Sequence, residues 1–139
     1  DFSLPSVIWG IDGDWMVNYI EKDYPFYPTD HCGVLRIHCP DILPQYFALA
    51  LQVEGEYEKF SRSNRASTQR IKSLTIQVPD LSIQKEILSM LNKFAEDIHF
   101  DKMTVSDIDK KSRKILVNYI GDICKEDSTL EKMLRIFNL

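Results

Sequence analysis

The chain has 139 residues, the length of one domain, and its 44% hydrophobic and 27% charged residues are ordinary for a soluble globular protein. No apolar run approaches the roughly 18 to 20 residues that span a bilayer, and no charged and then apolar leader indicates secretion. Three cysteines are an odd, sparse set that favours a reducing cytoplasm over a disulfide framework. These features predict a cytoplasmic protein that makes no contact with a membrane.

The net charge of -4 conceals a local excess of positive charge. Residues 59–79 hold five basic side chains and no acidic one, so the rest of the chain has 12 basic and 21 acidic residues, a net of -9. The five are Lys59, Arg62, Arg65, Arg70 and Lys72. A basic segment on an acidic body is a candidate surface for nucleic acid, and a solvated loop without a partner is the alternative.

The first third of the chain predicts β structure. Three short runs of apolar and β-favouring residues predict strands: Pro5–Trp9, Trp15–Ile20 and Gly33–Cys39. The Asp12-Gly13 pair between the first two runs is a strong hairpin signal. Residues 24–30 contain two prolines, which excludes a regular helix or a central strand there because proline lacks a backbone donor.

Helix and loop signals alternate in the middle of the chain. A start signal at Pro40–Pro44 predicts a helix from Gln45 to about Glu58, since proline is tolerated in a first turn. Its apolar residues fall near one face: Phe47, Ala50, Leu51 and Tyr57. Residues 60–70 have no apolar period and predict a polar loop. Residues 71–78 then predict a strand, which Pro79 stops.

The last part of the chain predicts helices. From Ser82, apolar residues recur at steps of three and four along one stripe: Ile83, Ile87, Met90, Leu91, Phe94 and Ile98. A capping box at Thr104–Asp107 begins a second helix, and a short third helix covers Leu130–Phe137. We therefore predict an α+β protein, with a mixed α/β domain over residues 1–80 and an antiparallel helical pair over 81–139. The stripes fit either an internal core or a face shared with another chain.

Signatures of catalysis are mostly absent. The chain has no G-x-G-x-x-G, P-loop or G-x-S-x-G motif, and no Asn-Pro-Pro-aromatic element of the kind that serves methyl transfer. We therefore expect no enzyme activity and no catalytic residue in this chain. Asp80 with Asp109-Lys110-Lys111 loosely fits a Mg²⁺-dependent nuclease, which remains a minor alternative.

Two His-Cys pairs, at residues 31–32 and 38–39, contain the donors that zinc prefers. An extended segment between them would hold the pairs roughly 20 Å apart. A zinc ion needs every donor within about 2.3 Å. We therefore expect no metal site, unless a tight hairpin brings the pairs together.

The basic segment has the richest set of candidate nucleic-acid ligands. Arginine can bind phosphate or guanine through two hydrogen bonds, Asn and Gln can read adenine, and small hydroxyl side chains let the backbone approach a phosphate. The candidates here are Lys59, Ser61, Arg62, Ser63, Asn64, Arg65, Ser67, Thr68, Gln69 and Arg70. The proline-containing loop adds Tyr27, Thr29 and His31, and core packing is the alternative for its aromatic residues.

Three segments in this order resemble a known family: Pro25–His31, Phe60–Ser67 and Ile76–Gln84. They are similar to the target-recognition domain in the specificity subunit of type I restriction–modification systems, and to related domains fused to adenine methyltransferases. The best single marker is a strand followed by Pro-x-Leu-x-x-Gln-x-x-Ile, present here as Val78–Ile87. The resemblance covers roughly residues 5–98.

The resemblance implies a non-catalytic module that reads double-stranded DNA and directs a partner adenine-N6 methyltransferase. S-adenosylmethionine would then be bound by the methyltransferase subunit or by a fused methyltransferase domain. The helix from Ser82 would be a spacer whose partner-docking residues are Gln84, Ile87, Leu91 and Phe94. The alternative is an assembly module of the same complex that does not bind DNA by itself.

Full specificity subunits carry two recognition domains and two helical spacers, and this chain has room for one of each. By the same comparison, the recognition domain over residues 1–80 is expected to be incomplete at its N-terminus. A half-size chain of this kind could form a homodimer or be the tail of a fused methyltransferase.

Overall fold

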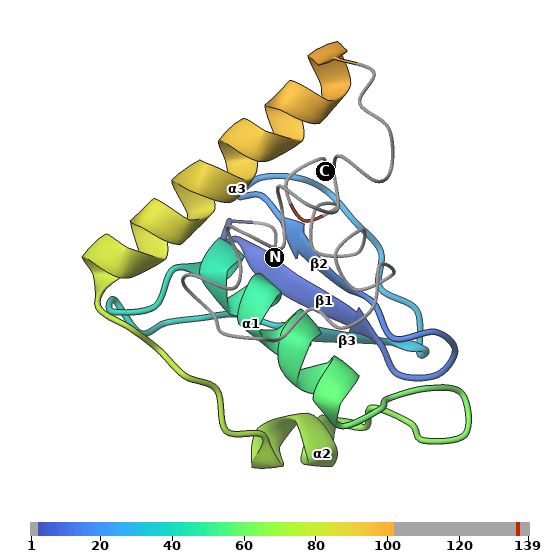
Figure 1. Cartoon of the computed structure of the whole chain (residues 1–139). Coiled ribbons are helices and arrows are strands. Elements are labelled where there is room, and N and C mark those ends of the chain that lie inside the picture. Colours follow the sequence, from blue (N-terminus) through green and yellow to red (C-terminus); the bar gives the residue numbers. More distant parts are fainter. Residues whose placement is uncertain (1–2, 102–135, 137–139) are drawn as a thin grey trace.

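The computed structural model describes residues 3–101 and Ile136, which form a small sheet, one helix packed against it, a long helix packed on that helix, and a short third helix (Figure 1). The strands are β1 (Ser6–Gly10), β2 (Val17–Ile20) and β3 (Cys32–Leu35). All pairings are antiparallel and β1 lies in the middle, so Val7 is opposite Tyr19 on one side and Leu35 on the other. The helices are α1 (Pro44–Tyr57), α2 (Thr68–Ser73) and α3 (Leu81–Asp101). The predicted α+β class is confirmed.

The predicted hairpin joins β1 and β2. Gly13 has a φ of 103°, a conformation that suits glycine because a side chain would be strained there. β2 begins two residues later than predicted, since Trp15 leaves the sheet and donates its indole N–H to the carbonyl of Gln52, at 2.8 Å. β3 ends at Leu35 rather than Cys39, because its partner strand β1 begins only at Ser6.

Helix α1 lies against the sheet (Figure 1) and is buried on more than one side. The expected inner face is partly confirmed: Leu51 is buried and the half-buried Phe47 and Ala50 pack against the core, but Tyr57 is 56% exposed. A near-continuous apolar sequence gives no clear face, and contacts with both the sheet and α3 decide the orientation instead. The residues buried in α1 are Tyr46, Ala48, Leu49, Leu51, Gln52, Val53 and Gly55.

Two contacts explain how closely α1 approaches the sheet. The fully buried Gln52 accepts a hydrogen bond from the backbone N–H of Val17 in β2, at 2.8 Å. Gly55 lies against Trp15, where an added Cβ would come within 2.0 Å of the indole ring. A buried amide therefore fixes the position of the helix along β2, and a glycine permits its close approach.

The strand predicted over residues 71–78 is absent, and helix α2 occupies the beginning of this segment. Ser67 is the N-cap of α2, and its hydroxyl accepts a hydrogen bond from the backbone N–H of Arg70 at 3.4 Å. Ile71 turns into the core, and residues 74–80 continue without regular structure. The β-branched residues of this segment are not paired with any strand of the described sheet, so the local cap decides the conformation.

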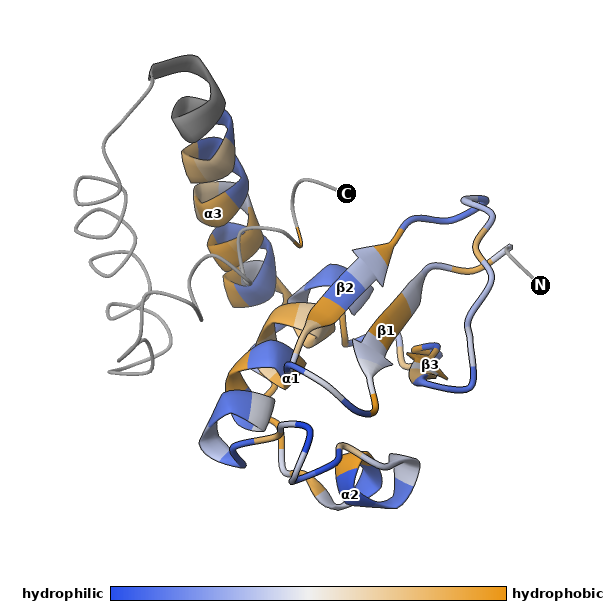
Figure 2. Ribbon diagram, turned by 90° about the vertical axis from the view of Figure 1, so that its right-hand side faces the viewer, coloured by the Kyte–Doolittle hydropathy of each residue, from blue (hydrophilic) through white to orange (hydrophobic). Residues whose placement is uncertain are grey.

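Helix α3 packs on α1 and joins the same hydrophobic core as the sheet. Figure 2 shows hydrophobic and hydrophilic residues alternating along it, as an amphipathic helix requires. Ile83 is 39% exposed, although the apolar stripe included it, whereas Ile87, Leu91 and Phe94 are buried. The helices predicted from Thr104 and over Leu130–Phe137 lie outside the described residues, apart from the buried Ile136. A division near residue 80 stays a prediction.

Candidate nucleic-acid interface

The two loops that the sequence nominated for DNA contact meet at the β1–β2 hairpin turn. The backbone N–H of Ile11 donates to the carbonyl of His31 at 2.9 Å, and the carbonyl of Ile11 accepts from the N–H of Ala66 at 3.0 Å. Ile11 therefore connects the turn to two segments, one that lies 20 positions later in the chain and one that lies 55 positions later. Residues 11–13 of the turn, residues 29–31 and residues 61–66 form one surface, called here the three-loop surface.

Asp12 lies at the centre of the three-loop surface, between two basic side chains. Its Oδ2 accepts hydrogen bonds from His31 Nδ1 at 2.9 Å and from Arg65 Nη2 at 3.1 Å. The hydrogen bond from His31 lowers the pKa of the Asp12 carboxyl below its ordinary value, and the charges of His31 and Arg65 act in the same direction. Sequence reasoning assigned Asp12 only to the turn, because nothing local indicates that Arg65 approaches it.

An open hollow of about 410 Å³ lies at this junction, lined by Asp12, Gly13, His31, Arg62 and Arg65. Arg62 is exposed, and it makes no ion pair with any described acidic residue. Arg65 is 60% exposed, so most of its guanidinium surface faces solvent although one nitrogen binds Asp12. The hollow therefore combines hydrogen-bond donors from two arginines with one central carboxylate.

The loop between α1 and α2 is a compact turn rather than an open coil. Ser61 and Asn64 exchange backbone hydrogen bonds of 3.0 and 3.1 Å. The Asn64 side-chain amide donates to the carbonyls of Glu58 and Lys59, at 2.8 and 3.1 Å. Lys59 has a φ of 55°, which turns the chain sharply after α1. Asn64 is therefore a structural residue of the loop, and its amide nitrogen is already used.

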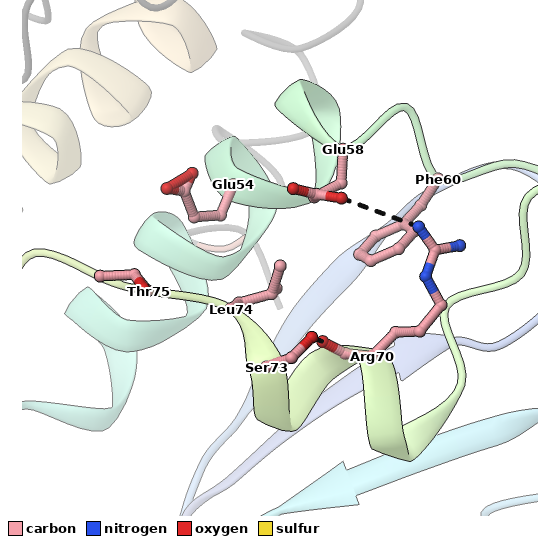
Figure 3. A pocket seen from close by; sticks show the side chains of 7 residues that line it. All are labelled: Glu54, Glu58, Phe60, Arg70, Ser73, Leu74 and Thr75. Carbon is pink, nitrogen blue, oxygen red and sulfur yellow. Dashed lines mark hydrogen bonds and ion pairs between the residues drawn. The ribbon is translucent and has the colours of Figure 1, made fainter.

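Arg70 also has a structural role, in the pocket that Figure 3 shows beside α2. Its guanidinium lies 4.7 Å from the centre of the Phe60 ring and 3.7 Å from the Glu58 carboxylate. Arg70 Nη1 donates to the Asn64 side-chain oxygen and, at 3.2 Å, to the Arg65 carbonyl. These contacts of Arg70 stabilise the shape of the loop, and they leave few of its N–H donors available for DNA.

Ser67 is the third candidate residue with a structural role, since it caps α2.

Most of the other candidate residues for DNA contact are accessible. Tyr27 is 93% exposed, which excludes the alternative of core packing for that ring. The exposed candidates are Tyr27, Thr29, His31, Lys59, Arg62, Ser63, Arg65, Thr68 and Gln69, while Ser61, Asn64, Ser67 and Arg70 are half-buried.

The positive charge of the basic segment is smaller in the folded chain than in the sequence. Asp12 neutralises Arg65 and Glu58 neutralises Arg70, and both acids lie outside residues 59–79. Lys59, Arg62 and Lys72 form no ion pair within the part of the chain that the structure describes. These three side chains are therefore the ones available to attract phosphates.

The side chains expected to dock a partner are used inside the chain. Gln84 is fully buried: its Oε1 accepts from the N–H of Leu43 at 2.9 Å, and its Nε2 donates to the carbonyls of Asp41 and Pro79 at 2.8 and 2.7 Å. Ile87, Leu91 and Phe94 are buried in the core. The expectation that these four side chains form an accessible face is therefore corrected, and a partner on α3 would meet its opposite, polar side.

Other predicted features can be located only in part. No group of three or more His, Cys, Asp or Glu side chains that could hold a metal ion occurs among the described residues. Asp80 is exposed and its carbonyl accepts from the N–H groups of Ile83 and Gln84, while Asp109–Lys111 lie outside the described residues. Within residues 3–101, no helix is both long and apolar enough to cross a membrane.

Comparison with known proteins agrees with the resemblance found in the sequence. The family model "Type I restriction modification DNA specificity domain" matches residues 2–107. A curated protein of Mycoplasma pneumoniae (strain ATCC 29342 / M129 / Subtype 1), named "Putative type I specificity subunit S.MpnORF89P", is 28% identical over 100 residues. This match covers 69% of the present chain and 29% of that protein, so the chain spans less than a third of the relative. No solved structure matches the chain.

Proposed function

This chain belongs to the family of type I restriction–modification DNA specificity domains, and we propose that it reads its DNA target through the three-loop surface. The observation that carries the proposal is the pair of backbone hydrogen bonds at Ile11, which bring residues 29–31 and 61–66 to one place. Two loops that are far apart in sequence can then contact one stretch of DNA together. Neither loop would present such a surface alone.

Residues of the three-loop surface and residues of the segments that flank it have different proposed roles. Lys59, Arg62 and Lys72 supply phosphate contacts, because no described acid neutralises them. Arg65, Thr29 and Gln69 are exposed polar side chains that can reach base edges in the major groove. Tyr27 adds an exposed aromatic ring two residues before Thr29. Asn64, Ser67 and Arg70 shape the loop.

The proposed partners follow from the same role. The chain directs an adenine-N6 methyltransferase subunit or fused domain, which binds S-adenosylmethionine and carries out the chemistry, while this chain supplies no catalytic residue. Docking uses the polar side of α3, with Lys85 and Lys93 among its exposed residues. A second recognition unit, from another copy of the chain, reads the other part of the target. The cytoplasm is the proposed compartment.

The test is fluorescence anisotropy with a random-sequence duplex pool over a series of salt concentrations. Arg62→Ala removes one phosphate contact, so affinity should fall on all sequences and the dependence of log K on log salt should become shallower by about 1. Lys93→Ala is the matched control, because it removes an exposed positive charge on α3. It should leave both quantities unchanged.

Equal effects of the two substitutions would mean that the DNA contact is not made by this surface. If the wild-type chain binds no DNA even at low salt, but still captures a methyltransferase subunit, the chain is an assembly module instead. Both results would contradict the proposed function.

A further inference from the structure

We infer that Arg65 reads a guanine of the target and that Asp12 is the positioning residue that orients it. This inference rests on the proposed DNA-reading function and assigns a base to one side chain of the three-loop surface. The residues that carry it are Asp12, His31 and Arg65, which come from three separate segments. The hairpin turn thus contributes to specificity, although none of its residues is among the DNA-contact candidates that the sequence suggested.

Asp12 holds Arg65 through one carboxylate oxygen. Its Oδ2 is 3.1 Å from Arg65 Nη2, and His31 Nδ1 lies 2.9 Å away on the same oxygen. The turn that carries Asp12 cannot easily move, because Ile11 is hydrogen-bonded to both flanking loops. Arg65 is therefore tethered at its guanidinium end by a fixed carboxylate.

The two partners differ in accessibility. The side chain of Asp12 is 29% exposed, whereas that of Arg65 is 60% exposed. The contact with Asp12 uses one nitrogen of the guanidinium, Nη2, and most of the side chain stays exposed. Arg62 lines the same hollow and is not paired with any described carboxylate. Of these two arginines, Arg65 is the one that a carboxylate holds.

The major-groove edge of guanine matches an oriented guanidinium. Guanine presents two acceptors, O6 and N7, in the major groove, and an oriented guanidinium can donate to both. Adenine presents a donor in place of O6, so the same guanidinium loses one hydrogen bond and meets a like partner. Orienting the arginine before binding reduces the side-chain entropy that is lost on reading the base. The arrangement therefore favours guanine over adenine.

A carboxylate in a DNA-binding surface has a cost in affinity. Asp12 repels phosphates, so it lowers affinity for DNA of any sequence. A residue that only supported the fold would change specific and non-specific binding in the same direction. A residue that positions Arg65 should instead trade affinity for discrimination, and this difference separates the two roles.

The experiment selects bound duplexes from a randomised pool with the full chain and sequences them. Four proteins are compared: wild type, Asp12→Asn, Arg65→Ala and Asp14→Asn. Asp14 is the matched control, because it is an exposed carboxylate of the same turn and forms no ion pair with a described residue. Thermal melting of each variant verifies that it is folded.

We expect Asp12→Asn to reduce the preference for guanine at one target position by about tenfold and to leave binding to the random pool unchanged or stronger. Arg65→Ala should remove the preference at that same position, whereas Asp14→Asn should retain it. Arg65→Ala also covers the case in which Asp12→Asn fails to fold, since Arg65 is an exposed side chain. Loss of the guanine preference at one and the same position in both variants supports the inference.

Two results overturn the inference, and they differ in meaning. If wild type selects a motif and neither Asp12→Asn nor Arg65→Ala alters any guanine in it, the positioning role is wrong and the proposed function stands. If wild type selects no motif and binds no DNA, the proposed function fails and the inference fails with it.

Discussion

The indole N–H of Trp9, in the middle strand, donates a hydrogen bond to the carbonyl of Ala66, at 2.9 Å and across 57 positions of sequence. Both residues are almost completely buried. The N–H of Ala66 is hydrogen-bonded as well, to the carbonyl of Ile11. The loop that carries Arg62 and Arg65 is thus attached to the β1–β2 hairpin through both backbone groups of the buried Ala66.

Gly33→Ala should destabilise the protein by about 1–3 kcal/mol, because overpacking forces neighbouring groups to move. An added Cβ at Gly33 would lie 2.1 Å from the Trp9 ring, which must shift and weaken its hydrogen bond to Ala66. Urea denaturation measures the change. Gly10→Ala is the control, since the nearest atom to its added Cβ is 3.7 Å away. Equal stability of the two variants would contradict the close contact.

Arg70→Ala should lower both the stability of the chain and its affinity for DNA. Loss of the contacts with Phe60, Asn64 and the Arg65 carbonyl costs about 1–2 kcal/mol of folding free energy and loosens the loop. Arg62→Ala should weaken DNA binding with a Tm close to that of wild type, because Arg62 is exposed. Melting curves and anisotropy on both variants distinguish the two roles. An unchanged Tm for Arg70→Ala would show that its contacts do not support the fold.

Gln84→Leu should destabilise the chain by about 1–3 kcal/mol, although leucine is similar in size and more apolar. The amide of Gln84 satisfies the N–H of Leu43 and the carbonyls of Asp41 and Pro79, and leucine would leave these groups unpaired. Chemical denaturation is the measurement, with Gln77→Leu as the control because Gln77 is exposed. A Gln84→Leu variant as stable as wild type would mean that water replaces the amide.

The contact between Asp12 and His31 predicts a dependence of stability on pH. Because the folded protein holds the pKa of Asp12 below its ordinary value of 3.8, the unfolded chain takes up a proton first as the pH falls. The contribution of Asp12 is therefore fully present above about pH 5 and is lost below pH 4. Melting temperatures from pH 6 to pH 3 should fall less steeply for Asp12→Asn than for wild type. The Asp14→Asn control should follow the wild-type curve, and a parallel Asp12→Asn curve would contradict the pKa shift.

Several features could be predicted from the sequence because they depend on neighbouring residues. The Asp12-Gly13 hairpin is one, since a positive φ at Gly13 is a local requirement. The helix that begins at Pro44 and the amphipathic helix from Leu81 are two more. The order of the three family segments also identified the DNA specificity domain family, which the match over residues 2–107 confirms.

Only the tertiary structure decided which residues of the candidate site face solvent and which hold it together. Asp12 meets Arg65 across 53 positions, and no local pattern reports such a contact. Asn64 and Arg70 are polar side chains, as Arg62 is, yet they form hydrogen bonds inside the loop. Gln84 was expected at a surface and is buried, because its amide satisfies the N–H of Leu43 and the carbonyls of Asp41 and Pro79. Residue type specifies what a side chain can bind, whereas long-range backbone contacts select what it does bind.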